Sequence, residues 1–267
     1  MANNDQPSPA LLEVADIYFE LQADWGITKH LGGIKATREL VELCHIDRDK
    51  YVLVVGCGVG TTPCYLAKGY ACRVVGVDLS ERMVDLSNKR AKKEGVVEMV
   101  EFRAADAQNL PFEDGLFDAV ISESVNAFIP DKQKVVNEYT RVTKPGGYIG
   151  FDEITWIKEP PPKIPEYMFR TMRARFHTEG GWKEFLESAG LKEIIAKIHK
   201  INALEQWLDE MRQFSILDSL KAWNRFWSLF VKSPVARQFT REALTMPRSI
   251  FSISKYWGYG VFAGRKL

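Results

Sequence analysis

The chain has 267 residues, a length that suits one large α/β domain or a domain with an appendage. Hydrophobic residues make up 46% and charged residues 27%, so the chain can bury a sizeable core and remain soluble. The formal net charge of +1 gives no electrostatic reason to expect nucleic acid or an anionic membrane as a partner.

The composition also argues against secretion, a membrane span and a metal site. The first residues, MANNDQPSPALLE, have neither a basic start nor an apolar run, so we expect no signal peptide. No segment approaches the roughly 18 apolar residues of a membrane-spanning helix. The four cysteines form no CxxC pair, and no His/Cys cluster has zinc spacing. We therefore expect a cytoplasmic protein with buried, reduced thiols and no metal.

Strands and helices are expected to alternate along most of the chain, after two N-terminal helices over 10–24 and 32–45. The strands are expected over 51–55, 73–77, 98–104, 117–122, 148–154 and 191–199, and the helices over about 62–68, 80–95, 130–143, 165–176 and 181–189. The run 51–55 is apolar throughout, as in a parallel strand buried on both faces. Ser80 is a suitable N-cap and Gly95 a suitable C-terminal stop for one of the helices. The pattern predicts a doubly wound parallel sheet with right-handed crossovers.

Residues 202–248 interrupt this alternation with aromatic-rich helices, and a strand-like segment over 252–264 closes the chain. We expect a Rossmann-like sheet of seven strands with N-terminal helices and a helical insertion before the last strand. The predicted division is an N-terminal helical cap at 1–46, a core at 47–200 plus 252–267, and a helical lid at 201–251. The aromatic block admits three interpretations: ordinary packing onto the core, a lid over an apolar substrate, or a helix lying at a membrane interface.

A glycine-rich turn follows the first strand of the predicted sheet. In VLVVGCGVG (52–60), Gly56, Gly58 and Gly60 permit a tight turn that lets a ligand approach the backbone. Ligands of open α/β sheets bind at this carboxyl end of the strands. The spacing is G-x-G-x-G, with Thr61 next, and lacks the third glycine of the dinucleotide motif G-x-G-x-x-G. A turn that binds nothing is the simpler alternative.

Two acidic residues end the next strands. Asp78 stands where a carboxylate can accept hydrogen bonds from a ribose diol, although it could also cap a helix. Asp106, in AADAQNLPF, could accept a hydrogen bond from the amino group of an adenine, and Ala105 and Ala107 leave room for a flat ring. A lone aspartate in a loop is more often a turn residue, and it is the combination with the glycine turn that favours a nucleoside site.

Four segments together carry a family resemblance: VLVVGCGVG, GVDLS, AADAQNLPFEDGLFDAVIS and RVTKPGGYIG. In this order and spacing they resemble the class I S-adenosylmethionine-dependent methyltransferases of the type 11 group, over roughly residues 35–155. LGGIKATRELVEL (31–43) and KYWGYGVFAGRK (255–266) are similar to small-molecule enzymes such as the phosphoethanolamine N-methyltransferases. The quinone and sterol methyltransferases share the core.

The resemblance implies a function, a cofactor and roles for individual residues. The function is in-line transfer of a methyl group from S-adenosyl-L-methionine to an amine, thiol, phenol or quinone-like small molecule, with S-adenosyl-L-homocysteine as product. The glycine loop would hold methionine, Asp78 ribose and Asp106 adenine. The implied cofactor set is Gly56, Cys57, Gly58, Gly60, Thr61, Asp78, Leu79, Met83, Ala105, Asp106, Ala107 and Glu123.

One position departs from the family pattern. The family places an acidic residue two positions before the first loop glycine, where this chain has Val54. We expect the lost charge-assisted contact to weaken cofactor binding by roughly 1–2 kcal/mol. The departure keeps open a cofactor-binding protein with weak or no catalysis. A nicotinamide-dependent oxidoreductase is a further alternative, but neither its glycine motif nor a catalytic pair is present.

The substrate side is less determined by the sequence. Glu123, Asn126 and His177 are the candidates for a catalytic role, and Tyr18, Trp25, His30, Trp207 and Tyr259 for the substrate pocket or lid. Glu123 is preferred because it follows the fourth strand, at the ligand-binding edge of the sheet. The alternatives are a solvent-facing carboxylate for Glu123 and surface or capping roles for the histidines. The expected partner is a small molecule bound by a monomer or homodimer, with no nucleic acid and with peripheral membrane contact left open.

Overall fold

The computed structural model describes residues 30–201 and 255–267, together with single residues between 223 and 241. The expected helix over 10–24 and most of the predicted lid, 201–251, lie outside the described residues.

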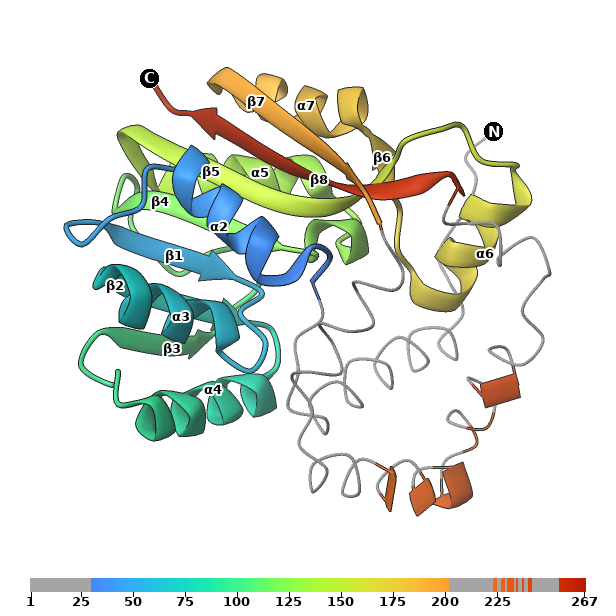
Figure 1. Ribbon diagram of the computed structural model, residues 1–267, viewed down its shortest axis with the longest axis horizontal. Coiled ribbons are helices and arrows are strands. Elements are labelled where there is room, and N and C mark those ends of the chain that lie inside the picture. The colour runs from blue at the N-terminus through green and yellow to red at the C-terminus, as the bar shows by residue number, and fades with distance from the viewer. Residues whose placement is uncertain are drawn as a thin grey trace.

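The described strands form one sheet, whose strands can be followed side by side in Figure 1. They are β1 (Tyr51–Val55), β2 (Arg73–Asp78), β3 (Val100–Ala104), β4 (Phe117–Glu123), β5 (Thr143–Trp156), β6 (His177–Thr178), β7 (Lys192–Lys200) and β8 (Trp257–Arg265). The order is β3-β2-β1-β4-β5-β8-β7, and β6 pairs with β5 beside this path. β1 to β5 run parallel to their neighbours, whereas β8 is antiparallel to both β5 and β7.

The topology confirms the predicted doubly wound Rossmann-like sheet. Three details differ from the sequence-based expectation. A parallel sheet was expected, whereas β8 is antiparallel to both of its neighbours. The two-residue strand β6 was not expected, and β5 begins at Thr143 rather than at residue 148, because the KPGG segment continues the strand. Strand order reverses between β1 and β4, which is where open α/β sheets bind ligands.

Helices cover both faces of the sheet. They are α2 (Gly33–Leu43), α3 (Thr61–Tyr70), α4 (Glu81–Glu94), α5 (Lys132–Val142), α6 (Lys163–Met172), α7 (Glu179–Ser188) and the short 3₁₀ helix η1 (Asn126–Phe128). α2, α3 and α4 pack on one face and α5 and α7 on the other, as Figure 1 shows. The predicted capping of α4 is confirmed, since the Ser80 hydroxyl accepts the Met83 N–H at 3.4 Å and Gly95 ends the helix with φ of 72°.

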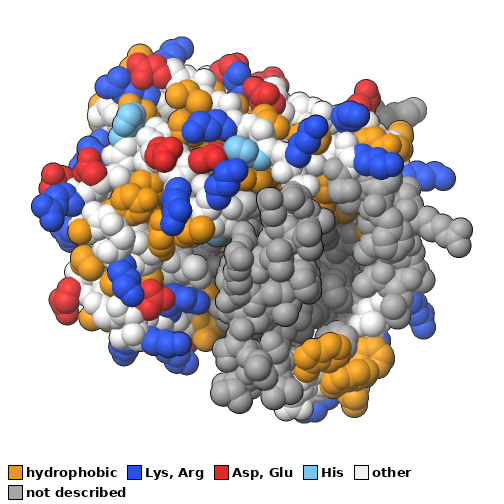
Figure 2. Space-filling view, viewed as in Figure 1, with side chains coloured by type: hydrophobic (Ala, Val, Ile, Leu, Met, Phe, Trp, Pro, Cys, Tyr) orange, Lys and Arg blue, Asp and Glu red, His pale blue; other side chains and the backbone are white. Residues whose placement is uncertain are grey.

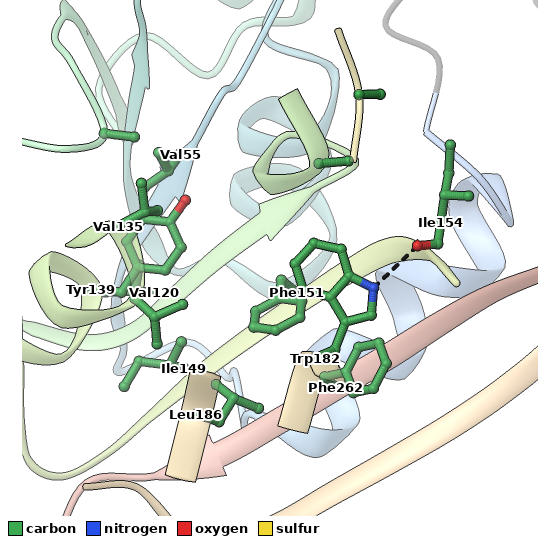
Figure 3. Packing of buried hydrophobic residues seen from close by; sticks show 14 of the residues in the cluster. Val55, Val120, Val135, Tyr139, Ile149, Phe151, Ile154, Trp182, Leu186 and Phe262 are labelled. Atoms are coloured by element: carbon green, nitrogen blue, oxygen red, sulfur yellow. Dashed lines mark hydrogen bonds between the residues drawn. The ribbon is translucent and has the colours of Figure 1, made fainter. Parts of the chain in front are cut away.

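Alternation along each strand supplies the two hydrophobic layers. Val52 and Val54 of β1 face the α2–α3 side, and Leu53 and Val55 face the α5–α7 side, as expected for a period of two. Figure 3 shows the second layer, where Trp182 of α7 is fully enclosed and its indole N–H donates to the Ile154 carbonyl at 3.1 Å. Both layers are therefore closed around the strands that carry the glycine turn.

Helix α2 belongs to the sheet covering rather than to a detached cap. A Cβ on Gly150 of β5 would lie 2.5 Å from the Cys44 sulfur and 3.0 Å from a Leu40 methyl, so the helix approaches the strand closely. Glycine at this position is what permits the approach. The helix also packs against Tyr259 and Val261 of β8.

The described residues between 223 and 241 carry exposed apolar side chains. Trp223 and Trp227 are 61% and 54% exposed, and their rings stack with centroids 6.5 Å apart. Figure 2 shows an apolar group at the lower edge of the molecule, in the region where Figure 1 draws these residues. Of the helices in the described part of the chain, none combines the length and the hydropathy that a bilayer crossing requires.

Candidate functional site

A cavity of about 550 Å³ opens at the carboxyl ends of β1, β2, β3 and β4. Its lining includes the glycine turn after β1, Asp78 at the end of β2, the loop after β3 and Glu123 at the end of β4. The predicted glycine and acidic residues therefore meet around one space, at the edge where strand order reverses. The volume lies within the range of small-molecule sites, about 300–1,000 Å³.

The turn after β1 requires glycine for steric reasons. Gly56 and Gly58 have φ of 68° and 53°, in the left-handed region that other residues avoid. A Cβ on Gly56 would lie 2.3 Å from a methyl of Val125, which follows β4. The backbone of the turn is thus packed directly against the segment after the neighbouring strand, while Gly56, Cys57 and Gly58 line the cavity.

Asp78 holds the turn in place. One carboxylate oxygen accepts the Gly58 N–H at 2.9 Å, and the other accepts the Ser80 N–H at 3.0 Å. Burial raises the pKa of Asp78, while these backbone donors act in the opposite direction. Each carboxylate oxygen has two lone pairs, so both can accept a further hydrogen bond from a ligand. The helix-capping alternative does not apply, because Ser80 caps α4.

The loop after β3 forms a second side of the cavity. Asp106 is exposed and uses one carboxylate oxygen to accept the Gln108 N–H at 2.8 Å, a turn contact. Ala105 and Ala107 line the space beside it. Across the loop lie two apolar side chains, Leu79 of the β2–α4 connection, which is 78% exposed, and Met83 of α4, which is buried. Small and apolar surfaces next to a free carboxylate oxygen suit a flat heterocycle with an amino group.

Glu123 lines the cavity from β4. One carboxylate oxygen accepts the Thr37 hydroxyl of α2 at 2.6 Å, and the other accepts the Thr62 hydroxyl of α3. The His30 Nε2 lies 3.8 Å from the first of these oxygens and 3.3 Å from the Thr37 hydroxyl. Glu123 is therefore an enclosed carboxylate rather than a solvent-facing one, and His30 shares its environment.

Two neighbouring acids of β5 shape the backbone after β4. Glu153 accepts the N–H groups of Val125, Asn126 and Ala127, and so caps the start of η1. Asp152 accepts the Ser124 hydroxyl at 3.0 Å. Burial raises the pKa of Glu153 to about 7, and burial together with the nearby carboxylates of Glu123 and Glu153 raises the pKa of Asp152.

Several candidates lie away from the cavity. The Asn126 amide oxygen accepts the Tyr139 hydroxyl at 2.9 Å, so the side chain turns into the core. His177 packs against Trp182 and Phe185, and burial lowers its pKa to about 4. Tyr259 packs on α2 and stacks on His199. None of these three is among the described residues that line the cavity.

The remaining candidates divide into two groups. Gly60 and Thr61 form the N-terminal end of α3 and are likewise not among the described lining residues. Tyr18, Trp25 and Trp207 lie outside the described residues. Thr37 and Thr62, the partners of Glu123, were not predicted from the sequence. Thr62 could have been suspected from its place in the first turn after the glycine loop, whereas no local signal marks Thr37.

Comparison with known proteins identifies the family. Residues 53–151, which span β1 to the middle of β5, match the model of the methyltransferase domain family. The chain carries a class I methyltransferase domain. That match contains the glycine turn, Asp78, Asp106 and Glu123, whereas His30, which also lines the cavity, lies outside it.

The most informative sequence relative is a plant enzyme. Phosphoethanolamine N-methyltransferase 3 of Arabidopsis thaliana is 29% identical over 168 residues, which cover 62% of this chain and 34% of that protein. The chain thus spans about a third of the length of the plant relatives it matches. The match leaves most of the relative's length uncovered.

Two solved structures share the fold of the methyltransferase domain. The [4+2]-cyclase SpnF superposes with a TM-score of 0.73 at 20% identity, covering 97% of this chain and 98% of that one. Phosphoethanolamine N-methyltransferase 2 of Haemonchus contortus, in complex with phosphomonomethylethanolamine and S-adenosylhomocysteine, gives 0.69 at 19% identity, covering 94% of this chain and 58% of that one. At such identities the likeness concerns the fold alone.

Proposed function

We propose that the protein binds S-adenosyl-L-methionine in this cavity and transfers its methyl group to a small molecule. The observation that carries the proposal is the convergence of the glycine turn, Asp78 and Asp106 on one space within a methyltransferase domain. The fold by itself would be weak support, because one fold hosts many activities, and the cyclase SpnF shares this one.

The residues present fit the cofactor. The Asp78 carboxylate, already fixed by two backbone N–H groups, keeps lone pairs for the two ribose hydroxyls. Asp106 is placed to accept the adenine amino group, and Leu79 and Met83 offer an apolar surface to the ring. The backbone of the glycine turn, free of Cβ atoms on Gly56 and Gly58, can approach the methionine part.

The reaction requires little of the protein beyond positioning the reactants. The cofactor supplies a methyl group that its sulfonium has already activated. The chain then has to align the acceptor in line with the S–CH₃ bond and exclude water, and positioning of this kind can supply about 7–11 kcal/mol. A base is required only for an acceptor that arrives protonated.

We infer an amine as the first acceptor class to test, since the sequence relatives include phosphoethanolamine and sarcosine/dimethylglycine N-methyltransferases. The division into cap, core and lid also remains a proposal, with residues 1–46 and 201–251 closing over the substrate. Within the cap, the part described as α2 already packs on the sheet. A binding protein without turnover is the second candidate, and Val54 is the observation that favours it.

Calorimetry with S-adenosylmethionine, S-adenosylhomocysteine and NAD tests the cofactor. We expect binding of the first two only, and at least tenfold weaker binding to Asp78→Ala. Asp85→Ala, which removes an exposed carboxylate of α4, is the matched control. An unchanged dissociation constant in Asp78→Ala would remove the ribose assignment. Release of S-adenosylhomocysteine with amine, thiol, phenol and quinone panels then separates transfer from binding alone.

A further inference from the structure

Glu123 is an enclosed carboxylate whose described partners are neutral. Its side chain is 6% exposed, yet it lines the cavity. The hydrogen bonds that it receives come from the hydroxyls of Thr37 and Thr62. Within the described part of the chain, no lysine or arginine is paired with it. Removing a carboxylate from water without a cation is costly, so this arrangement favours a positively charged occupant.

The neighbouring acidic residues supply no neutralising positive charge. Glu123 pairs in register with Asp152, and Glu153 follows on the same strand. The Nε2 of His30 lies 3.8 Å from a carboxylate oxygen of Glu123, and His30 is a cation only when it is protonated. Thr62 also places the Glu123 carboxylate beside the first turn of α3, where the helix dipole stabilises an anion. Helix and hydroxyls hold the anion in place but do not neutralise it.

Register brings Glu123 next to the position that lacks an acid. β1 and β4 are parallel neighbours, with Val55 opposite Ser122. Glu123 is one residue further on, at the level of Gly56, and both Glu123 and Val54 line the cavity. An acidic group is thus present beside the glycine turn, although it comes from β4 instead of from β1.

We propose that Glu123 binds the α-ammonium group of the methionine part of S-adenosylmethionine, supplying from β4 the charge that Val54 does not. The inference rests on the proposed function, since it assigns a subsite to the same cofactor. It makes Glu123 a binding residue, and it removes the reason to expect impaired cofactor binding from Val54. The Thr37 and Thr62 hydroxyls then fix the orientation of the carboxylate.

The decisive comparison uses two ligands that differ only in the amino-acid half. S-adenosylhomocysteine carries the ammonium, whereas 5′-methylthioadenosine keeps adenine, ribose and sulfur but lacks it. In Glu123→Gln, which preserves shape and removes charge, we expect at least tenfold weaker binding of S-adenosylhomocysteine by calorimetry. Binding of 5′-methylthioadenosine should stay within twofold of wild type, which also shows that the site remains folded. Glu101→Gln, at an exposed carboxylate of β3, is the control and should leave both affinities unchanged.

A rescue variant tests the link to Val54. Adding Val54→Asp to Glu123→Gln should raise the affinity for S-adenosylhomocysteine at least threefold above that of Glu123→Gln alone, because it returns a carboxylate to the same wall of the cavity. Two results in Glu123→Gln would overturn the inference: an equal loss of affinity for both ligands, or no loss for either. It would also be overturned if the double variant still binds 5′-methylthioadenosine but does not regain affinity for S-adenosylhomocysteine. If wild type binds neither ligand, the proposed function itself fails.

Discussion

The buried carboxylate of Glu153 should make the stability of the fold depend on pH in an identifiable way. Burial raises its pKa from the ordinary value of 4.5 to about 7, although three backbone N–H groups and Lys132 favour the ionised form. Between these two pKa values the folded protein holds the proton and the unfolded chain does not. Stability therefore decreases as pH rises through this interval, and levels off above it.

The size of the effect follows from the two pKa values. Integrating the linkage relation from about pH 5 to about pH 8 gives a loss of about 2–3 kcal/mol in the free energy of unfolding from this one group. Glu153→Gln cannot ionise, so this contribution disappears. We expect the free energy of unfolding of Glu153→Gln minus that of wild type to increase by about 2–3 kcal/mol over the same pH range.

Urea denaturation followed by circular dichroism measures this difference at the two pH values. The comparison is made between variant and wild type because the raised pKa of Asp152 adds a dependence of the same sign to both proteins. Glu101→Gln serves as the control and should run parallel to wild type. Parallel curves for Glu153→Gln and wild type would show that Glu153 titrates alike in the folded and unfolded states, and would refute the reasoning.

Two further predictions concern the glycine turn and the thiols. Gly56→Ala, with φ of 68° and a Val125 methyl 2.3 Å from the new Cβ, should lower the free energy of unfolding by about 1–3 kcal/mol. Val125→Ala in the same chain should return part of the loss in a thermal melt, and a melt unchanged by Gly56→Ala would contradict the packing. All four cysteines are buried, and burial raises the pKa of Cys44 to about 12 and those of Cys64 and Cys72 to about 11. Ellman's reagent near neutral pH should therefore label them only at the rate of unfolding, and rapid labelling of the native protein would contradict this.

Local signals were sufficient for the sheet and for the nucleoside side of the site. The strand and helix pattern predicted β1 to β5 and β7 in order, and the glycines that follow β1 marked the edge that carries the cavity. Asp78 and Asp106 could be placed because each follows its strand directly. The direction of a strand is enough to bring such residues together, and no knowledge of packing is needed.

Side-chain direction after β4 could not be predicted in the same way. Asn126 and Glu123 are three positions apart and both were expected to face the ligand, yet Asn126 points to Tyr139 in the core. The difference comes from the bend at Ser124, which has φ of 56°, and from the turn of η1, which Glu153 caps from another strand. A cap supplied across the sheet leaves no trace in the local sequence.

The acids of β5 show why this bend is stable. Successive residues of a strand point to opposite faces of the sheet. The adjacent acids Asp152 and Glu153 therefore contact different parts of the segment that follows β4. Asp152 accepts the hydroxyl of Ser124, which itself accepts the Leu31 N–H, and Glu153 accepts three N–H groups just beyond. The carboxylates that cost most to bury thus fix the backbone that places Val125 against Gly56 and Glu123 beside the glycine turn. The buried acids of β5 in this way help to set the position of Glu123 in the wall of the cavity.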